Sequence, residues 1–182
     1  SSVKAVIWMK NLNIAIVGLG NIGSYLFNYL SINKKIITEK NNCLPIIKYV
    51  SAKTRNKKRN IRVKKSQWIN HYHKVTKLKD VDLIVELIGG AEGPAKKLVF
   101  AALRNGKHVV TANKALIAKY GDQLAKIAET NKVNLEFEAS VCGGVPIIRS
   151  LKEGLIANKI SKIYGILNGT SNYILSSMDK QD

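Results

Sequence analysis

Cysteine is scarce in this sequence, and no long hydrophobic run is present. The two cysteines, Cys43 and Cys142, lie far apart without CxxC spacing, which argues against a disulfide framework and against a thiolate metal site. No apolar run reaches the roughly 18 residues of a transmembrane helix, and the apolar run in the opening SSVKAVIWMK is too short for a secretory signal. We therefore expect a cytoplasmic protein without a membrane partner, whose natural start is Met9.

Acidic residues are also few: 12 Asp and Glu stand against 30 Lys and Arg, for a formal net charge of +18. One basic stretch contains no acidic residue and runs into Trp68 and Tyr72, a pattern typical of nucleic-acid binding. A basic, non-enzymatic binding module is therefore the alternative function. Because the other lysines are scattered over amphipathic segments, solvated faces are the favoured interpretation, and we expect no nucleic-acid partner. His71 and His73 follow without a third ligand nearby, which favours a solvated loop over a metal site. The basic residues of the stretch are Lys48, Lys53, Arg55, Lys57, Lys58, Arg59, Arg62, Lys64 and Lys65.

Short apolar runs alternate with segments of helical periodicity along most of the chain. Such alternation predicts an α/β protein with a doubly wound parallel sheet, a Rossmann-type dinucleotide-binding domain. A polar linker containing Asn33, Asn41 and Asn42 is expected before the second strand, and the basic stretch up to Lys79 is expected to form a loop. The predicted strands are 12–17, 45–52, 81–88, 108–111 and 134–139, and the predicted helices are 22–30, 94–105 and 114–131, the last broken near Gly121.

A GxGxxG motif lies between the first predicted strand and the first predicted helix, which is the context the motif requires. The first glycine permits a tight turn, the second lets the backbone approach a pyrophosphate, and the third allows close packing of the helix. The free N–H groups at the helix start would receive the anion. The expected cofactor contacts are Gly18, Leu19, Gly20, Asn21, Ile22 and Gly23.

The residues after the second predicted strand bear on the choice of cofactor. An NAD site normally has a carboxylate there for the ribose hydroxyls, whereas a 2′-phosphate requires cations. No carboxylate lies between Lys40 and Lys79. Lys53 and Arg55 are therefore candidate ligands of a 2′-phosphate, with Lys57 behind them, and NADP is favoured with NAD as the alternative.

Two further segments come to the carboxyl edge of the predicted sheet, where ligands of such folds bind. The third predicted strand ends at residues 86–90, which places Ile88 and Gly89 as candidate contacts of the nicotinamide ribose. Lys114 begins a helix after the fourth predicted strand, and the positive end of that helix would lower the pKa of the lysine toward values useful for proton transfer. From the residues alone, however, a surface lysine is the favoured interpretation.

Four segments together resemble the homoserine dehydrogenase family: ELIGG at 86–90, GKHVVTANKALIA at 106–118, FEASVCGGVPII at 137–148 and GILNGTSNYIL at 165–175. They occur in the family's order and spacing. The resemblance implies reversible reduction of L-aspartate 4-semialdehyde to L-homoserine with NAD(P)H, on the route to threonine and methionine.

The resemblance also implies roles for particular residues. Lys114 matches the family's first active-site lysine, close to the nicotinamide and the substrate. The NGT segment at 168–170 matches the start of the substrate and dimerisation domain, which implies a dinucleotide-binding domain at 9–140, the incomplete start of a catalytic domain at 141–182, and a homodimer. Glu138, Val141, Gly143 and Val145 match a loop that binds a monovalent cation such as sodium, largely through backbone carbonyls.

The sequence departs from the family at its carboxyl end. Family members continue with substrate-binding carboxylates and a second catalytic lysine, and Asp179, Lys180 and Asp182 do not match these. We therefore expect a truncated chain that is inactive by itself. Cys142 beside two glycines offers a rival, a thiol nucleophile of an NADP-dependent semialdehyde dehydrogenase, but no histidine follows His108 to act as its base.

Overall fold

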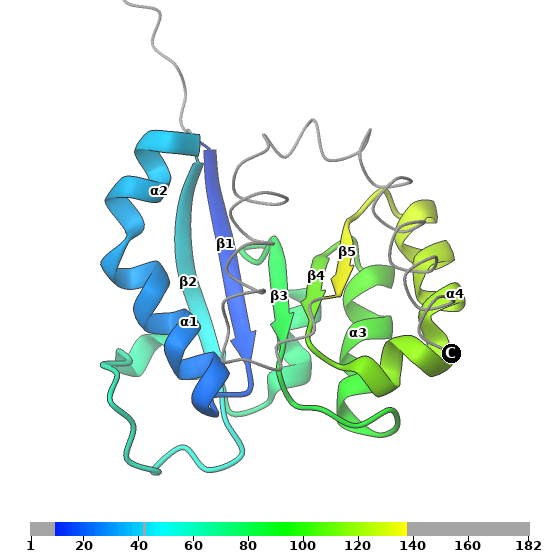
Figure 1. Ribbon diagram of the computed structural model, residues 1–182, viewed down its shortest axis with the longest axis horizontal. Helices are drawn as coiled ribbons and strands as arrows, with labels where there is room; N and C mark the ends of the chain where they lie inside the picture. Colours follow the sequence, from blue (N-terminus) through cyan, green and yellow to red (C-terminus); the bar gives the residue numbers. More distant parts are fainter. Residues whose placement is uncertain (1–9, 42, 138–182) are drawn as a thin grey trace, which may run out of the picture.

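The protein is a parallel β-sheet covered by helices on both faces (Figure 1). The computed structural model describes residues 10–41 and 43–137. In this part the strands pair in the order β2-β1-β3-β4-β5, and every pair is parallel. The α/β doubly wound sheet predicted from the sequence is confirmed. The strands are β1 (Lys10–Val17), β2 (Cys43–Ser51), β3 (Leu83–Glu86), β4 (His108–Thr111) and β5 (Leu135–Phe137), and the helices are α1 (Asn21–Ile32), α2 (Lys34–Asn41), α3 (Pro94–Arg104) and α4 (Lys114–Thr130), with short 3₁₀ helices η1 (Lys65–Gln67) and η2 (Tyr72–Lys77).

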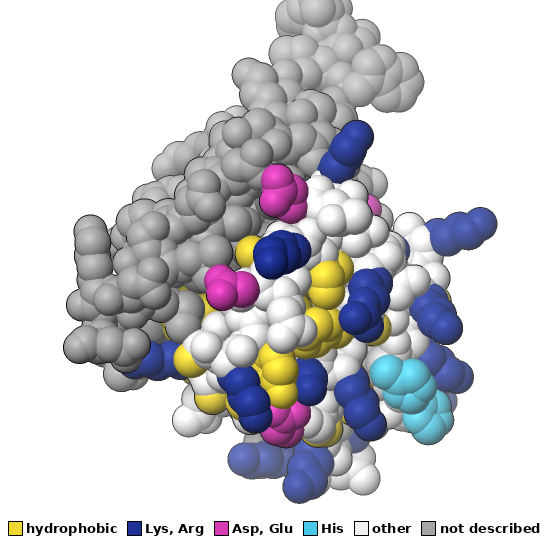
Figure 2. Space-filling view, turned by 90° about the vertical axis from the view of Figure 1, so that its right-hand side faces the viewer, with side chains coloured by type: hydrophobic (Ala, Val, Ile, Leu, Met, Phe, Trp, Pro, Cys, Tyr) yellow, Lys and Arg dark blue, Asp and Glu magenta, His cyan; other side chains and the backbone are white. Residues whose placement is uncertain are grey.

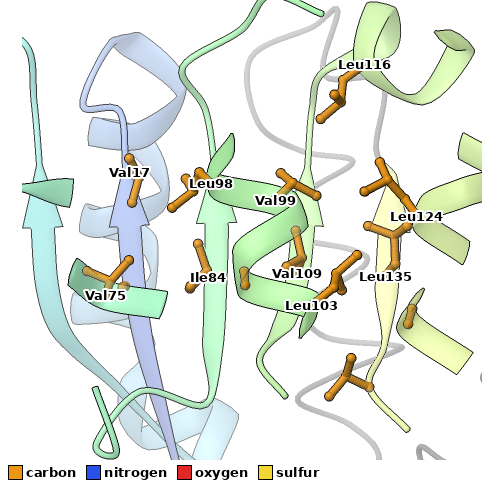
Figure 3. Close-up of a cluster of buried hydrophobic side chains, with 14 of the residues drawn as sticks. Val17, Val75, Ile84, Leu98, Val99, Leu103, Val109, Leu116, Leu124 and Leu135 are labelled. Carbon is orange, nitrogen blue, oxygen red and sulfur yellow. The ribbon is translucent and has the colours of Figure 1, made fainter. Parts of the chain in front are cut away.

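Two apolar clusters hold the layers together, one on each face of the sheet. Successive residues of β1 alternate between them: Ile14 and Ile16 join the cluster under α1 and α2, while Ala15 and Val17 join the cluster under α3, α4 and η2. Figure 3 shows the second cluster, in which side chains from α3 and α4 meet side chains of the strands. Because both faces are covered, the central strands are continuous apolar runs, as parallel strands are expected to be.

The chain reverses its winding direction between β1 and β3. From β1 it moves outward through α1 to β2, and it then returns past β1 to β3 on the other side. In open α/β sheets the ends of the two strands at such a switch point leave a crevice at the carboxyl edge, where ligands bind. In Figure 1 the arrowheads of β1 and β3 point to this edge.

Two sequence expectations were wrong. The segment expected to be a polar linker contains α2, which is held because Ile37 is buried in the apolar cluster of the α1 face. Helix α4 runs through Gly121 without the predicted break. Glycine costs a helix interior only about 1 kcal/mol, and Gly121 is buried within α4, where tertiary packing stabilises the helix.

The basic stretch is irregular, as expected of a loop, but it is packed on both faces of the sheet. Trp68 packs against the α1-side cluster, and Tyr72 packs against the opposite one. Val75 and Thr76 are buried. This anchoring fixes the cations of the stretch relative to the sheet edge. No helix in residues 10–41 and 43–137 has the length and apolar character needed to cross a membrane.

His108 makes the stability of this fold depend on pH. Burial lowers the pKa of His108 from its ordinary value of 6.5, and the charge of Asp82 opposes this only in part. Its Nδ1 accepts a hydrogen bond from the backbone N–H of Asn134 at 2.9 Å, which requires a neutral ring. Because the unfolded chain then binds the proton more tightly, stability is full above about pH 6.5 and falls as pH falls toward the lowered pKa of the folded state.

Urea denaturation at pH 7.5 and 5.5 measures this loss. His108→Gln, which keeps an acceptor, is expected to reduce the difference between the two pH values, and the exposed His73→Gln to leave it unchanged. An unaltered pH dependence in His108→Gln would assign the effect to other groups.

Candidate functional site

The glycine turn, residues 18–23, joins β1 to α1 at the switch point. Gly18 has φ of 108°, a conformation that favours glycine, and a Cβ there would lie 2.6 Å from the carbonyl oxygen of Leu87. A Cβ on Gly23 would lie 2.1 Å from the carbonyl oxygen of Gly18. A Cβ on Gly20 would meet no atom of the described residues within 4 Å. Gly18 and Gly23 are therefore required by the protein's own packing, whereas Gly20 leaves open space.

The open space at Gly20 lies at the start of α1. Gly20 is the N-cap residue, no side chain caps the helix, and the first turn contains no acidic residue. The positive end of the helix dipole and its free N–H groups are therefore not neutralised locally. This arrangement suits a pyrophosphate, which a side chain at Gly20 would displace.

One cavity, the lysine cavity, lies between the glycine turn and the end of β2. Its volume is about 730 Å³. It is lined in part by Gly18, Leu19 and Gly20, by Lys53 and Lys57, and by Arg59. Among the described residues that line it there is no carboxylate. The exposed Ile88 forms an apolar part of its wall.

The two cations predicted to bind a 2′-phosphate are separated by the structure. Lys53 lines the lysine cavity, whereas Arg55 does not. The Arg55 guanidinium instead lies 5.2 Å from the centre of the Trp68 ring. Lys57, expected behind these two residues, lies on the cavity wall. Arg59 was not predicted from the sequence as a site residue. Its place in the cavity wall depends on how the chain folds after Thr54 and approaches the glycine turn.

A second cavity, the carboxyl-edge cavity, lies where β3 and β4 end. It has a volume of about 480 Å³ and shares Gly20 and Ile88 with the lysine cavity. The two cavities are therefore adjacent along the edge of the sheet. Its lining includes the predicted residues Asn21, Ile22, Gly23 and Gly89, and also Glu86 and Asn113.

Glu86 lines this second cavity and bonds the loop that follows β3. The carboxylate is fully buried, and its Oε1 accepts the backbone N–H of Ile88 at 2.8 Å and of Gly89 at 3.0 Å. Its Oε2 accepts the hydroxyl of Thr111. The Glu86 side chain thus fixes the loop after β3 to the end of β4.

Asn113 continues this connection to α4. Its backbone N–H donates to the hydroxyl oxygen of Thr111, and its amide donates to the carbonyl oxygen of Gly90 at 2.6 Å. Its amide oxygen accepts the backbone N–H of Leu116 and so caps α4. Lys114 follows as the first residue of the helix. It is exposed, and it does not itself line the carboxyl-edge cavity.

The cation site implied by the resemblance cannot be placed beside these cavities. Glu138, Val141, Gly143 and Val145 lie outside the described residues, as does Cys142. Among residues 10–41 and 43–137 no group of three His, Cys, Asp or Glu side chains could hold a metal ion. The rings of His71 and His73 lie 5.8 Å apart with both residues exposed.

Positive charge is not confined to the cavities. Figure 2 shows Lys and Arg side chains spread over the α4 side of the molecule, among acidic and apolar ones. On this face the charges are dispersed, as solvated charges usually are.

Comparison with known proteins assigns the family. The family model for the homoserine dehydrogenase NAD-binding domain matches residues 18–138, and the homoserine dehydrogenase model matches residues 146–182. The chain belongs to the homoserine dehydrogenase family. It is 43% identical to homoserine dehydrogenase from Neisseria gonorrhoeae over 93% of this chain, and 40% identical to the Bacillus subtilis enzyme over 95% of this chain. The basic, non-enzymatic alternative is not supported.

A solved homoserine dehydrogenase agrees with this assignment. The structure from S. aureus is similar with a TM-score of 0.67 and 36% identity, covering 74% of this chain and 33% of that one. The match spans 39% of the Neisseria protein and 40% of the Bacillus protein. This chain therefore spans about two fifths of the length of the curated homoserine dehydrogenases it matches.

Proposed function

We propose that this chain binds NADPH along the two adjacent cavities and supplies the cofactor half of a homoserine dehydrogenase site. The observation that carries the proposal is the open space at Gly20. This residue lies at the start of α1, which no side chain caps, and it lines both cavities. The pyrophosphate is proposed to contact the glycine turn, the 2′-phosphate Lys53 and Lys57, and the nicotinamide ribose Ile88 and Gly89.

A nicotinamide bound beside Ile88 and Gly89 would supply the hydride for reduction of the aldehyde carbon of L-aspartate 4-semialdehyde. The resulting alkoxide oxygen needs a proton to give L-homoserine, and Lys114 is the candidate donor at that oxygen. The N-cap bonds of Asn113 hold the start of α4, and therefore the backbone of Lys114, against the loop that follows β3. Glu86 holds that same loop from the other side.

The remaining assignments from the resemblance stay proposals. They are a monovalent cation held by Glu138, Val141, Gly143 and Val145, a homodimer, a cytoplasmic location, and a domain boundary after residue 140.

NADPH is expected to bind more tightly than NADH, because Lys53 and Lys57 line the lysine cavity and no carboxylate of residues 10–41 and 43–137 does. Lys53→Glu should weaken NADPH binding more than NADH binding, by about 1 to 3 kcal/mol on the scale of charge-assisted hydrogen bonds. Fluorescence titration of both nucleotides with both proteins measures the difference.

Arg55→Glu is the matched variant. It makes the same charge change two residues away, but its side chain lies over Trp68 and not along the cavity. We expect it to affect the two nucleotides less than Lys53→Glu does. Equal affinities of the unaltered chain for NADPH and NADH would reject the NADP assignment.

A further inference from the structure

Arg59 joins two segments of the candidate site through its guanidinium group. Its Nε donates to the carbonyl oxygen of Leu19, inside the glycine turn, at 2.8 Å. Its Nη atoms donate to three carbonyl oxygens of the segment that follows β2: Thr54 at 2.8 Å, and Arg55 and Lys57 at 3.1 Å each. Four of the five N–H groups of an arginine are thereby used.

The segment that Arg59 holds, residues 53–57, is called here the lysine turn. A backbone bond from the N–H of Lys57 to the carbonyl oxygen of Thr54, at 3.3 Å, also closes it. Lys53 and Lys57 stand at its two ends, and both line the lysine cavity. The shape of this turn, and hence the placement of both ammonium groups, therefore depends largely on Arg59.

The charge of Arg59 is not neutralised by the protein in the part that the structure describes. The ion pairs among these residues join Glu92 to Lys96 and to Lys119, and none of their carboxylates accepts a bond from Arg59. Carbonyl oxygens satisfy its donors without cancelling its charge. The half-buried guanidinium thus adds to the positive potential around the lysine cavity, which attracts a phosphate.

We propose that Arg59 is a positioning residue for recognition of the 2′-phosphate. The pyrophosphate and the 2′-phosphate are covalently linked in the cofactor, so a site for both must keep the glycine turn and the lysine turn at a fixed spacing. Arg59 fixes that spacing, because its planar fork bonds both turns at once, which the single ammonium group of a lysine cannot reproduce. The inference rests on the proposed function, since it assumes that the cofactor lies in these cavities.

The test compares NADPH and NADH affinities of the full chain and its variants by fluorescence titration. Arg59→Ala is expected to weaken NADPH binding about tenfold, the size of one charge-assisted hydrogen bond, and NADH binding much less. Arg59→Lys should recover only part of the loss. Arg62→Ala is the matched control, because it removes an equal charge from the same stretch at a residue that does not line the lysine cavity. It should leave the ratio of the two affinities unchanged.

A double-mutant cycle separates positioning from direct contact. If Arg59 acts by placing Lys53 and Lys57, then Arg59→Ala should change the NADPH to NADH ratio very little in a Lys53→Ala, Lys57→Ala background. If Arg59→Ala lowers the NADPH to NADH ratio in that background as much as it does in the unaltered chain, Arg59 is a direct phosphate ligand. That result would overturn the proposal. An equal loss for both nucleotides would overturn it too, since that would mean a general structural role.

Two results keep the inference distinct from the proposed function. If the unaltered chain binds neither nucleotide, the proposed function fails and the inference fails with it. If the unaltered chain prefers NADPH and Arg59→Ala, folded by circular dichroism, keeps the same preference, only the inference fails. Should Arg59→Ala not fold, Arg59→Lys takes its place, and an unchanged ratio in that variant likewise rejects the positioning role.

Discussion

Gly20→Val is expected to abolish binding of NADPH while leaving the fold intact. A valine Cβ at this position meets no atom within 4 Å, and the backbone of Gly20 has φ of −77°, which any residue adopts. The side chain would instead fill the space in which the proposed pyrophosphate contacts the start of α1. Loss of those contacts should raise the Kd at least about a hundredfold, roughly 2.8 kcal/mol. Fluorescence titration measures the Kd, and thermal unfolding measures the fold.

Gly23→Ala is the matched variant in the same turn. Unlike Gly20→Val, it should destabilise the fold. Its single added carbon would lie 2.1 Å from the carbonyl oxygen of Gly18, so the glycine turn must shift. Such overpacking costs about 1 to 3 kcal/mol and should lower Tm by several degrees. Retained NADPH binding in a folded Gly20→Val would show that the glycines form only a tight turn, and would remove the observation on which the proposed function rests.

The contrast between these glycines also shows what the sequence could predict. The GxGxxG spacing placed a strand, a turn and a helix correctly, because Gly18 and Gly23 are required by close packing at the turn, while Gly20 leaves open space at the helix start. The alternation of apolar runs gave the sheet, since strands buried on both faces leave a continuous apolar pattern. Helix α2 escaped prediction because its eight residues, KKIITEKN, are mostly polar, and the burial of Ile37 against the sheet is a tertiary effect.

The parts of the candidate site that the sequence did not predict depend on contacts between distant residues. Arg59 bonds Leu19 across 40 positions, and Thr111 bonds Glu86 across 25. In the sequence Arg59 is one cation in a basic stretch, and Glu86 is one polar residue at the end of a strand. The difference between Lys53 and Arg55 has the same origin. In the sequence the two cations look equivalent, whereas in the structure Lys53 lines the cavity and the Arg55 guanidinium lies 5.2 Å from the centre of the Trp68 ring.

The largest expected effect concerns turnover. The 182-residue chain should bind NADPH yet leave L-aspartate 4-semialdehyde unreduced. It spans about two fifths of the length of its curated relatives, and the resemblance assigns the second catalytic lysine and the substrate carboxylates to the part of the family that this sequence does not match. Lys114 would then act without the groups that the resemblance assigns to substrate binding.

Positioning explains why the expected loss is so large. Holding the reactants in the right geometry can lower the activation barrier by about 7 to 11 kcal/mol. Loss of this positioning therefore returns the rate nearly to that of the uncatalysed reaction. NADPH oxidation with L-aspartate 4-semialdehyde is measured with this chain and, as a positive control, with the full-length Bacillus subtilis homoserine dehydrogenase. Binding should persist in this chain while turnover disappears, because Gly20 and the lysine cavity belong to the part that is present. Turnover of about 1 to 1000 per second, as in ordinary enzymes, would mean that residues within these 182 positions complete the site; Lys114→Ala would then show whether Lys114 is one of them.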